Sequence, residues 1–202
     1  MTHEQQSPEP PDAGNSPEHG RALQPRIWIG SLADYNNGEL HGDWIDANRP
    51  PETIHADIQR ILASGPAAQR GEAPEEWGIF DYDEFGGLHI DEYDAIEDVS
   101  RLAQDVARFG EPFAIWAETL GPADATSESF ADSYLGQFAS PTAYAEELVA
   151  DLEGERALDS VPDWLKPYTA IDYDALAHDI QLSGDITIID DSEGRSHFYR
   201  TP

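Results

Sequence analysis

Apolar residues change their spacing along the chain, and each change predicts a different secondary-structure element. In residues 27–30 isoleucine alternates with tryptophan and glycine, a period of two that is typical of a strand. Short strands are also predicted at 44–47 and 76–83, and residues 52–64 place isoleucine and leucine at helical spacing. We therefore expect residues 26–87 to form a small α+β domain with three strands and one helix.

The middle of the chain carries the pattern of helices. On a helical wheel that starts at Asp91, a set of apolar residues falls on one face: Ile96, Val99, Ala103 and Val106. Aspartates fall on a second face of the same wheel: Asp94, Asp98 and Asp105. Two more helices are predicted at 111–120 and 126–139, separated by a glycine–proline pair. Residues 88–140 are therefore expected to form a wholly helical domain.

The last third of the chain combines helix signals with a hairpin. Ser140 and Asp172 each stand where a helix N-cap is expected, before helices that the pattern places at 141–152 and 173–182. Two β-rich segments then flank a turn, so residues 141–202 are predicted to form an α+β domain. Residues 1–25 are rich in proline, glycine, serine and glutamate, and they are expected to form a disordered arm. The predicted fold is an α+β chain of three small domains in an elongated row after this arm.

Charge is the feature that sets this composition apart. The chain contains 41 aspartates and glutamates against 11 lysines and arginines, a formal net charge of −30 with a pI near 4.1. The net charge is spread along the chain: −3 in residues 1–25, −8 in 26–90, −9 in 91–140 and −10 in 141–202. Such a body repels nucleic acids and anionic membranes and attracts cationic surfaces. We therefore expect no nucleic-acid partner and no membrane partner.

The sequence shows no recognisable targeting signal. The chain has no apolar run of transmembrane length, and its first residues are polar instead of signal-like. A soluble cytoplasmic protein is expected.

No group of residues stands out as a catalytic centre or a metal site. The chain has no cysteine, and its seven histidines include no pair with the spacing of a helical zinc site. Residues 81–92 match part of a calcium-binding loop, but Phe85 stands at a position where a ligand is required. Serine-nucleophile and phosphate-loop motifs are absent from the sequence. We expect no cofactor, no metal and no catalytic residue, and hence a protein that is not an enzyme.

Two functions fit the composition equally well. A B-form duplex carries one negative charge for about every 1.7 Å of axis, so a net charge of −30 corresponds to about 50 Å of DNA. An elongated acidic body is therefore suited to imitate DNA. The alternative is an acid-adapted, halophilic-type soluble protein with a ligand-binding or enzymatic role, whose acidic surface serves solubility in high salt.

Four segments in collinear order carry a resemblance to a known family: residues 26–47, 75–88, 130–152 and 168–180. Three patterns within them are specific in combination: SLADYNNG, G-x-W-I-D-A, and F-x-D-x-Y-x-G-x-F-x-S followed by YAEEL. Through them the chain resembles the ArdA-type antirestriction proteins of mobile elements over residues 26–202.

The resemblance implies a dimeric mimic of B-DNA made of three small domains. It implies a partner as well, the modification and specificity subunits of a type I restriction–modification enzyme, whose DNA groove the mimic occupies. Both restriction and modification would then be blocked. The residues that would imitate phosphates are these acids: Asp81, Asp83, Glu84, Asp91, Asp94, Asp98, Asp105, Glu111, Glu118, Glu128, Asp132, Glu146, Glu147 and Asp151. A set of aromatic residues is expected to be structural instead: Trp28, Trp44, Trp77, Tyr134, Phe138 and Tyr144.

Overall fold

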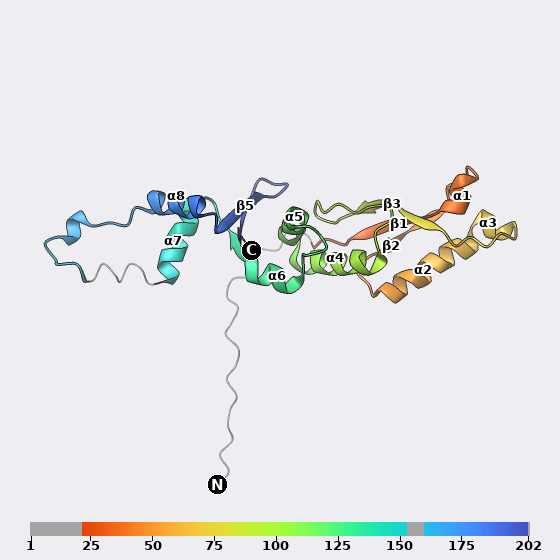
Figure 1. Cartoon of the computed structure of the whole chain (residues 1–202), viewed down its shortest axis with the longest axis horizontal. Helices are drawn as coiled ribbons and strands as arrows, with labels where there is room; N and C mark the ends of the chain where they lie inside the picture. Colours follow the sequence, from red (N-terminus) through yellow and green to blue (C-terminus); the bar gives the residue numbers. More distant parts are fainter. Residues whose placement is uncertain (1–21, 153–159, 202) are drawn as a thin grey trace, which may run out of the picture.

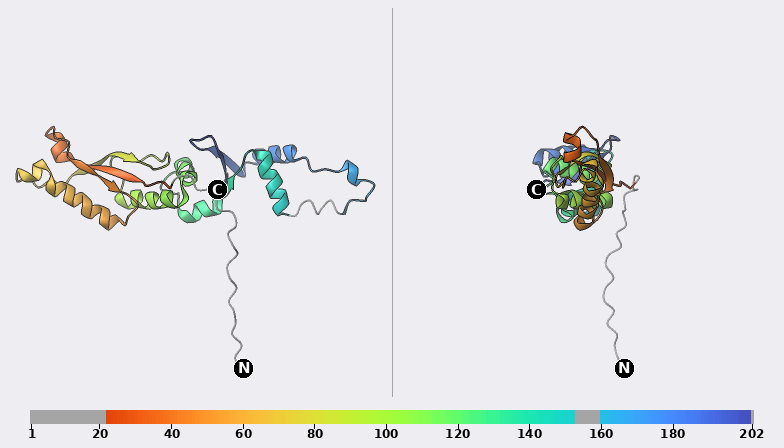
Figure 2. Two further views of the ribbon diagram at one scale, coloured as in Figure 1. Left: turned by 180° about the vertical axis from the view of Figure 1, so that it is seen from behind. Right: turned by 90° about the vertical axis from the view of Figure 1, so that its right-hand side faces the viewer.

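A computed structural model of the protein describes residues 22–152 and 160–201, which form an elongated body with the elements arranged along its length (Figure 1). The end-on view in Figure 2 shows that the cross-section of this body is narrow. The described residues form eight α-helices and two three-stranded sheets, which confirms the predicted α+β class. Most of the predicted disordered arm falls on residues 1–21, outside the described residues.

The end of that predicted arm, residues 22–25, belongs to the folded body. The Ala47 N–H donates to the Pro25 carbonyl at 2.9 Å, and the Gln24 N–H donates to the Glu84 carboxylate at 2.9 Å. Leu23 packs against the apolar core. The folded body therefore begins before the predicted boundary at residue 26.

The first sheet contains the three strands that the sequence predicts. Its antiparallel strands lie in the order β2-β1-β3, with these bounds: β1 Arg26–Ser31, β2 Gly42–Asp46 and β3 Trp77–Asp83. The predicted helix, α2 (Pro51–Ser64), packs on one face of this sheet (Figure 1). Because the strand and helix periods each gather apolar side chains on one side, isoleucines meet between them and are fully buried: Ile27, Ile29, Ile54 and Ile58.

Two short helices in the loops of this region are not predicted from the sequence. α1 (Leu32–Asn36) begins after Ser31, whose hydroxyl accepts the Asp34 N–H at 3.3 Å. The buried Asp34 carboxylate accepts the Ala67 N–H at 2.6 Å, inside α3 (Pro66–Gln69). This bond links the two loops at one end of the body.

The helical middle starts later than the wheel assumes. α4 (Ile96–Phe109) and α5 (Glu111–Leu120) are confirmed, but residues 91–95 are not helical, and Ala95 is extended with φ −65° and ψ 132°. Asp94 therefore does not lie on the predicted aspartate face of the helix. The apolar face is confirmed, because its predicted members are at most 1% exposed: Ile96, Val99, Ala103 and Val106.

The predicted helix at 126–139 is wrong in its second half. α6 (Ser127–Ser133) leads directly into a strand, β4 (Tyr134–Gln137), where Gly136 has φ +128°. That backbone conformation favours glycine and is incompatible with a helix. β4 belongs to a second antiparallel sheet of order β4-β6-β5, whose other strands form the predicted hairpin: β5 Ile186–Asp190 and β6 Ser196–Arg200. The middle of the chain is therefore not wholly helical.

Two helices with the predicted caps pack together in the last third of the body. Ser140 caps α7 (Pro141–Asp151) and Asp172 caps α8 (Tyr173–Ser183), each through its side-chain oxygen. A 3₁₀ turn, Lys166–Tyr168, lies between them in sequence. Each helix buries one residue, and both residues are alanines: Ala145 and Ala177.

One apolar core runs through most of the body. Buried residues in contact extend from Ile27 in the first sheet through the helical middle to Tyr199 on β6. Phe85 and Leu88, which lie on either side of the first predicted domain boundary, are both buried in this same core. The three-domain division therefore stays a prediction.

Candidate interaction surface

Within residues 22–152 and 160–201, few basic side chains lack an ion pair with an acid of the same chain. Seven of the 41 acids and two of the 11 bases lie outside the described residues, which leaves 34 acids and nine bases. Seven of those nine bases form an ion pair with an acid of the same chain: Arg26, Arg49, Arg60, Arg70, Arg101, Lys166 and Arg195. Because the positive charges are held beside the body's own carboxylates, the excess of acids sets the field around it.

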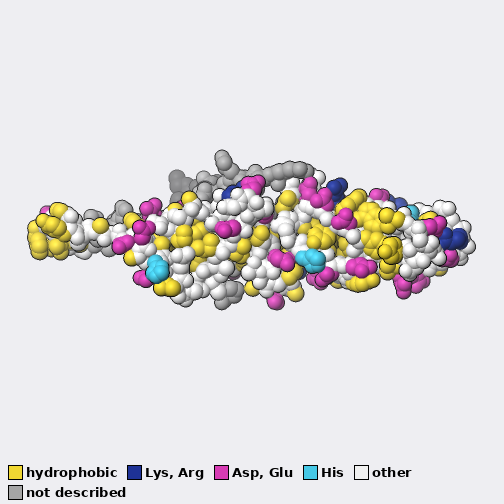
Figure 3. All heavy atoms as spheres, turned by 90° about the horizontal axis from the view of Figure 1, so that it is seen from above, with side chains coloured by type: hydrophobic (Ala, Val, Ile, Leu, Met, Phe, Trp, Pro, Cys, Tyr) yellow, Lys and Arg dark blue, Asp and Glu magenta, His cyan; other side chains and the backbone are white. Residues whose placement is uncertain are grey.

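The acids predicted to imitate phosphates are spread along the body. Nine of the fourteen are exposed: Asp81, Asp91, Asp98, Glu118, Glu128, Asp132, Glu146, Glu147 and Asp151. Four are half-buried: Asp83, Glu84, Asp94 and Glu111. Figure 3 shows acidic side chains distributed over the length of one face, with no single cluster. The structure therefore offers an extended anionic surface.

Several of the half-buried acids also hold the fold together. The Asp83 carboxylate lies 2.6 Å from the Arg26 guanidinium across the first sheet. Glu111 accepts the Ser192 N–H at 2.9 Å and lies 3.8 Å from the Arg195 guanidinium. These acids contribute to stability besides any part in recognition.

Asp105 differs from the other predicted acids because it is only 8% exposed. It lies on α4, and its carboxylate accepts the hydroxyl of Ser127, the first residue of α6. The helical wheel places Asp105 on an exposed face, but α6 packs over that side of α4. Asp105 is therefore not part of the exposed anionic surface.

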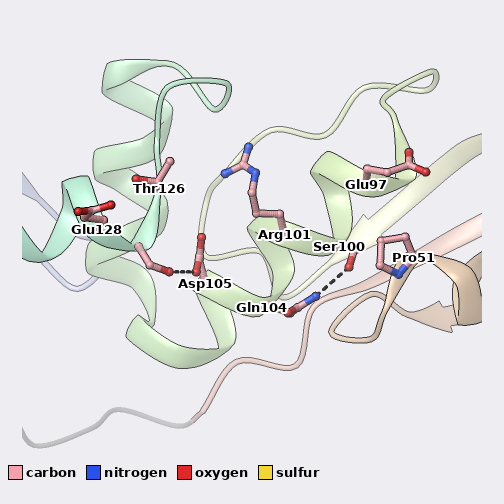
Figure 4. A pocket seen from close by; sticks show the side chains of 9 residues that line it. Pro51, Glu97, Ser100, Arg101, Gln104, Asp105, Thr126 and Glu128 are labelled. Atoms are coloured by element: carbon pink, nitrogen blue, oxygen red, sulfur yellow. Dashed lines mark hydrogen bonds between the residues drawn. The ribbon is translucent and has the colours of Figure 1, made fainter.

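A hollow lies between α4, the start of α2 and the start of α6 (Figure 4). Its cation, Arg101, donates to the carbonyls of Ala125 at 2.5 Å and Pro122 at 3.0 Å. Gln104 donates to Ser100 at 2.9 Å within the same hollow. Arg101 thus holds α4 against the α5–α6 loop, whereas the bond from Gln104 to Ser100 lies within α4.

The partial calcium-loop pattern of residues 81–92 has the structure of a strand followed by a buried turn. Asp81 and Asp83 lie on β3, while Phe85, Leu88 and Ile90 are at most 4% exposed. In the described ranges no three histidine, aspartate or glutamate side chains are grouped so that they could hold a metal ion.

Sequence reasoning missed a buried polar network where the second sheet meets α5. His197 on β6 is 2% exposed, and its ring nitrogens lie 3.0 Å from the Asp191 carboxylate and 3.0 Å from the Tyr134 hydroxyl. An ionised Asp191 only accepts hydrogen bonds, so Nε2 of His197 donates to it. Nδ1 of a neutral His197 then accepts the Tyr134 O–H. These residues are 63 positions apart in sequence at most, and no local spacing connects β4 to β6.

The pKa values in this network follow from its geometry. Burial raises the pKa of Asp191, but hydrogen bonds from the Arg195 N–H and the His197 ring outweigh burial, so the pKa lies well below its usual range. Burial raises the pKa of Tyr134 to about 12, which keeps its hydroxyl proton available for His197. Beside the network, the Tyr199 ring packs against Tyr134 at 5.4 Å between centroids, and the Tyr199 hydroxyl donates to the Pro112 carbonyl on α5 at 2.8 Å. Tyr199 therefore ties the second sheet to the helical middle.

The structure thus defines a class of protein: an elongated acidic α+β body whose described bases are mostly paired internally. In the described ranges no helix has both the length and the apolar character needed to cross a membrane. The family model described as antirestriction protein (ArdA) matches residues 27–193. The chain therefore belongs to the ArdA family of antirestriction proteins, which confirms the resemblance found in the sequence. Comparison with curated proteins found no match.

Proposed function

We propose that this protein is an acidic mimic of B-DNA that occupies the DNA-binding groove of type I restriction–modification enzymes and inhibits both restriction and modification. Family membership supports the antirestriction role. The observation that carries the mimicry is the extended anionic surface, whose acids run from β3 to α7 on a narrow body. A groove that binds DNA is lined with basic side chains, and the extended anionic surface of this protein is complementary to those charges.

The size of the charge fits this role. The net charge of −30 equals that of about 50 Å of duplex. An elongated body presents this charge along a line, as DNA does, whereas a compact globule would concentrate it. The mimic acts by occupying the groove in the modification and specificity subunits, so it needs no catalytic residue, metal or cofactor. Its place of action is the cytoplasm, where those enzymes meet DNA.

A homodimer would extend the imitation to about 100 Å of duplex, twice the length that one chain matches. Support comes from the last third of the body, where α7 and α8 bury little and large apolar side chains are 72–83% exposed: Leu152, Trp164, Tyr168 and Leu182. If these side chains gather into one apolar patch in the dimer, they would form a protein interface, since contiguous apolar surface marks such sites. We propose that a second copy covers these side chains.

A competition titration tests the proposal. A type I methyltransferase is bound to a labelled duplex that contains its site, and the purified protein is added at about 0.1 M salt. The proposal predicts displacement of the duplex, with an affinity that falls as salt increases. The protein would not be a DNA mimic if it left the duplex bound at this salt.

A matched pair of variants shows whether charge carries the effect. The neutralised variant changes five exposed acids: Asp81→Asn, Glu118→Gln, Glu128→Gln, Glu146→Gln and Glu147→Gln. The control exchanges aspartate and glutamate at the same five positions and keeps every charge. At about 0.3–0.5 kcal/mol for each exposed charge, the neutralised variant should compete about tenfold more weakly or worse. The control should compete like the natural sequence.

The acid-adapted alternative predicts other results for the same protein. Its fold would require molar salt, and its acids would show no preference for a DNA-binding enzyme. Thermal unfolding in low and high salt, measured beside the titration, separates the two functions.

A further inference from the structure

The first sheet has one face that α2 covers and one that carries an ordered arrangement of charged and aromatic side chains. Cross-strand neighbours share a face of an antiparallel sheet, so the register defines three rows on the outer side. The rows across β2, β1 and β3 are as follows: Asp46, Arg26, Asp83; Trp44, Trp28, Asp81; and Gly42, Gly30, Gly78. Seen from the side opposite α2, hydrophobic side chains gather at this end of the body among acidic ones (Figure 3).

Glycines allow aromatic rings to lie directly on this face. A Cβ atom on Gly30 would lie 2.7 Å from the rings of both Trp28 and Phe80, and one on Gly42 would lie 2.4 Å from the Trp28 ring. No side chain fits at these two positions while the rings stay in place. The ring centroids of Trp28 and Phe80 are 5.6 Å apart, and those of Tyr35 and Phe80 are 5.3 Å apart. We call Trp28, Tyr35 and Phe80 the aromatic platform.

Carboxylates border the aromatic platform. Asp81 is exposed and lies across from Trp28, and the Glu92 side chain lies 3.1 Å from the Cβ position of Gly78 on the same face. Tyr35, at the edge of the platform, is 58% exposed. A planar cation that approaches this face would therefore meet aromatic rings beneath it and carboxylates beside it.

The chain itself contains one example of this arrangement. The Arg26 guanidinium lies 4.7 Å from the ring centroid of Trp44, and one of its nitrogens lies 2.6 Å from the Asp83 carboxylate. An arginine thus already lies over the ring of Trp44, which shares a row with Trp28 and Asp81, and pairs with the carboxylate of Asp83 in its own row. The platform offers the same two kinds of group, and within residues 22–152 and 160–201 the arginines that lie over a ring do so elsewhere, on Trp44 and Phe109.

We propose that the aromatic platform, with Asp81, binds an arginine side chain of a basic partner protein. The ring faces attract the guanidinium plane, and the carboxylate accepts its N–H groups. Lysine fits less well, because its ammonium is a strongly hydrated point charge without a flat face. The inference rests on the proposed function in one respect, that the basic partner is the restriction–modification enzyme. Phosphate imitation alone would not require aromatic rings on an anionic surface.

Binding of short peptides to the full chain tests this inference without the enzyme. An oligo-arginine peptide and an oligo-lysine peptide of equal length are titrated at the same salt concentration. The arginine peptide should bind about two- to fivefold more tightly than the lysine peptide. A double variant, Tyr35→Leu with Phe80→Leu, leaves only Trp28 of the aromatic platform and should reduce this preference, whereas Tyr35→Phe keeps the ring and should retain it.

Two controls separate the platform from general charge attraction. Glu147→Gln, on α7 far along the chain, should weaken both peptides equally and keep their ratio. The melting temperature and the circular dichroism spectrum of the leucine double variant, each compared with those of the natural sequence, test whether the variant is folded. Equal binding of the two peptides by the natural sequence would overturn the inference, as would an unchanged ratio in a folded double variant. Failure of the DNA competition would instead overturn the proposed function, and it would leave the arginine preference in place.

Discussion

The buried Asp191 gives the sharpest test of how the second sheet is held to the rest of the body. Its carboxylate is 8% exposed and accepts hydrogen bonds from the backbone N–H groups of Arg195 at 2.8 Å and Glu193 at 3.0 Å. It also accepts the Arg195 side-chain Nε–H at 2.5 Å and the His197 Nε2–H at 3.0 Å. The substitution Asp191→Asn keeps the shape of this group and removes its charge.

The expected cost follows from which of these bonds an amide can replace. The oxygen of the new side-chain amide would still accept the two backbone N–H groups, but its NH₂ would face the side chains of Arg195 and His197. His197 can change tautomer and accept, whereas a guanidinium cannot. A hydrogen bond to a charged group contributes about 1.5–3 kcal/mol, and breaking a buried ion pair costs about 3–5 kcal/mol. Because Arg195 also pairs with Glu111 and Glu193, we expect about 2–4 kcal/mol lost from the free energy of unfolding.

The pH dependence of the free energy of unfolding tests the same carboxylate independently. The folded-state pKa of Asp191 lies below its unfolded value, so its contribution is fully present above about pH 4 and is lost as the pH falls. The variant lacks this group. The gap in unfolding free energy between the two proteins should therefore shrink below about pH 4, by at most about 1.4 kcal/mol for each pH unit.

Urea unfolding followed by tryptophan fluorescence measures both effects. Asp190→Asn is the matched control, because this exposed neighbour accepts one hydroxyl, from Ser196 at 2.7 Å, and should change stability by less than about 1 kcal/mol. A cost below about 1 kcal/mol for Asp191→Asn, or a gap that stays constant down to about pH 2, would refute the reasoning.

Three further substitutions test other parts of the fold by the same unfolding assay. Phe113→Ala removes a fully buried ring that contacts three other aromatic residues, and it should cost about 3–5 kcal/mol. Ser140→Ala removes the cap of α7 and should cost about 1 kcal/mol, seen as a lower urea midpoint with an unchanged slope. Gly30→Ala should cost about 1–3 kcal/mol because its Cβ collides with two rings, and a neutral result would mean that the rings move aside easily.

The elements whose signals are local were predictable from the sequence. Alternating residues in β1, helical spacing in α2 and the caps of α7 and α8 all describe interactions within a few residues. These elements appear in the structure close to their predicted bounds. Local physical chemistry therefore determines where they begin and end.

The strand β4 shows why elements that depend on contacts between distant residues were not predictable from the sequence. Phe130, Tyr134 and Phe138 are four residues apart, which is helical spacing, and the pattern therefore favoured one long helix. In the structure Tyr134 does stack on Phe130, but its hydroxyl bonds His197, a residue from the far end of the chain. Pairing with β6 decides the conformation, and Gly136 allows it. A tertiary contact of this kind leaves no local period.

The acidic character of the candidate surface was predictable from the sequence, but the exposure of each individual acid was not. Composition alone shows that the body is acidic, and nine of the predicted acids are exposed. Burial of Asp105 depends on the position of Ser127 on another helix, which no spacing within α4 reveals. The Asp191 network was missed for the same reason, because Tyr134 on β4 meets the β5–β6 hairpin, which carries Asp191 and His197, only in the folded protein.

Exposed apolar side chains distinguish a binding surface from one adapted only for solubility. An acidic surface that serves solubility gains nothing from large apolar groups, because they promote association. In this protein Tyr35 is 58% exposed, Trp164 74% and Tyr168 83%, at opposite ends of the described body. Charge accelerates the approach of a basic partner and is screened by salt, whereas aromatic contacts keep much of their affinity when salt rises. Under the proposed function, a protein that combines the two would compete with DNA at physiological salt, where DNA has only its phosphates and base edges to offer the same groove.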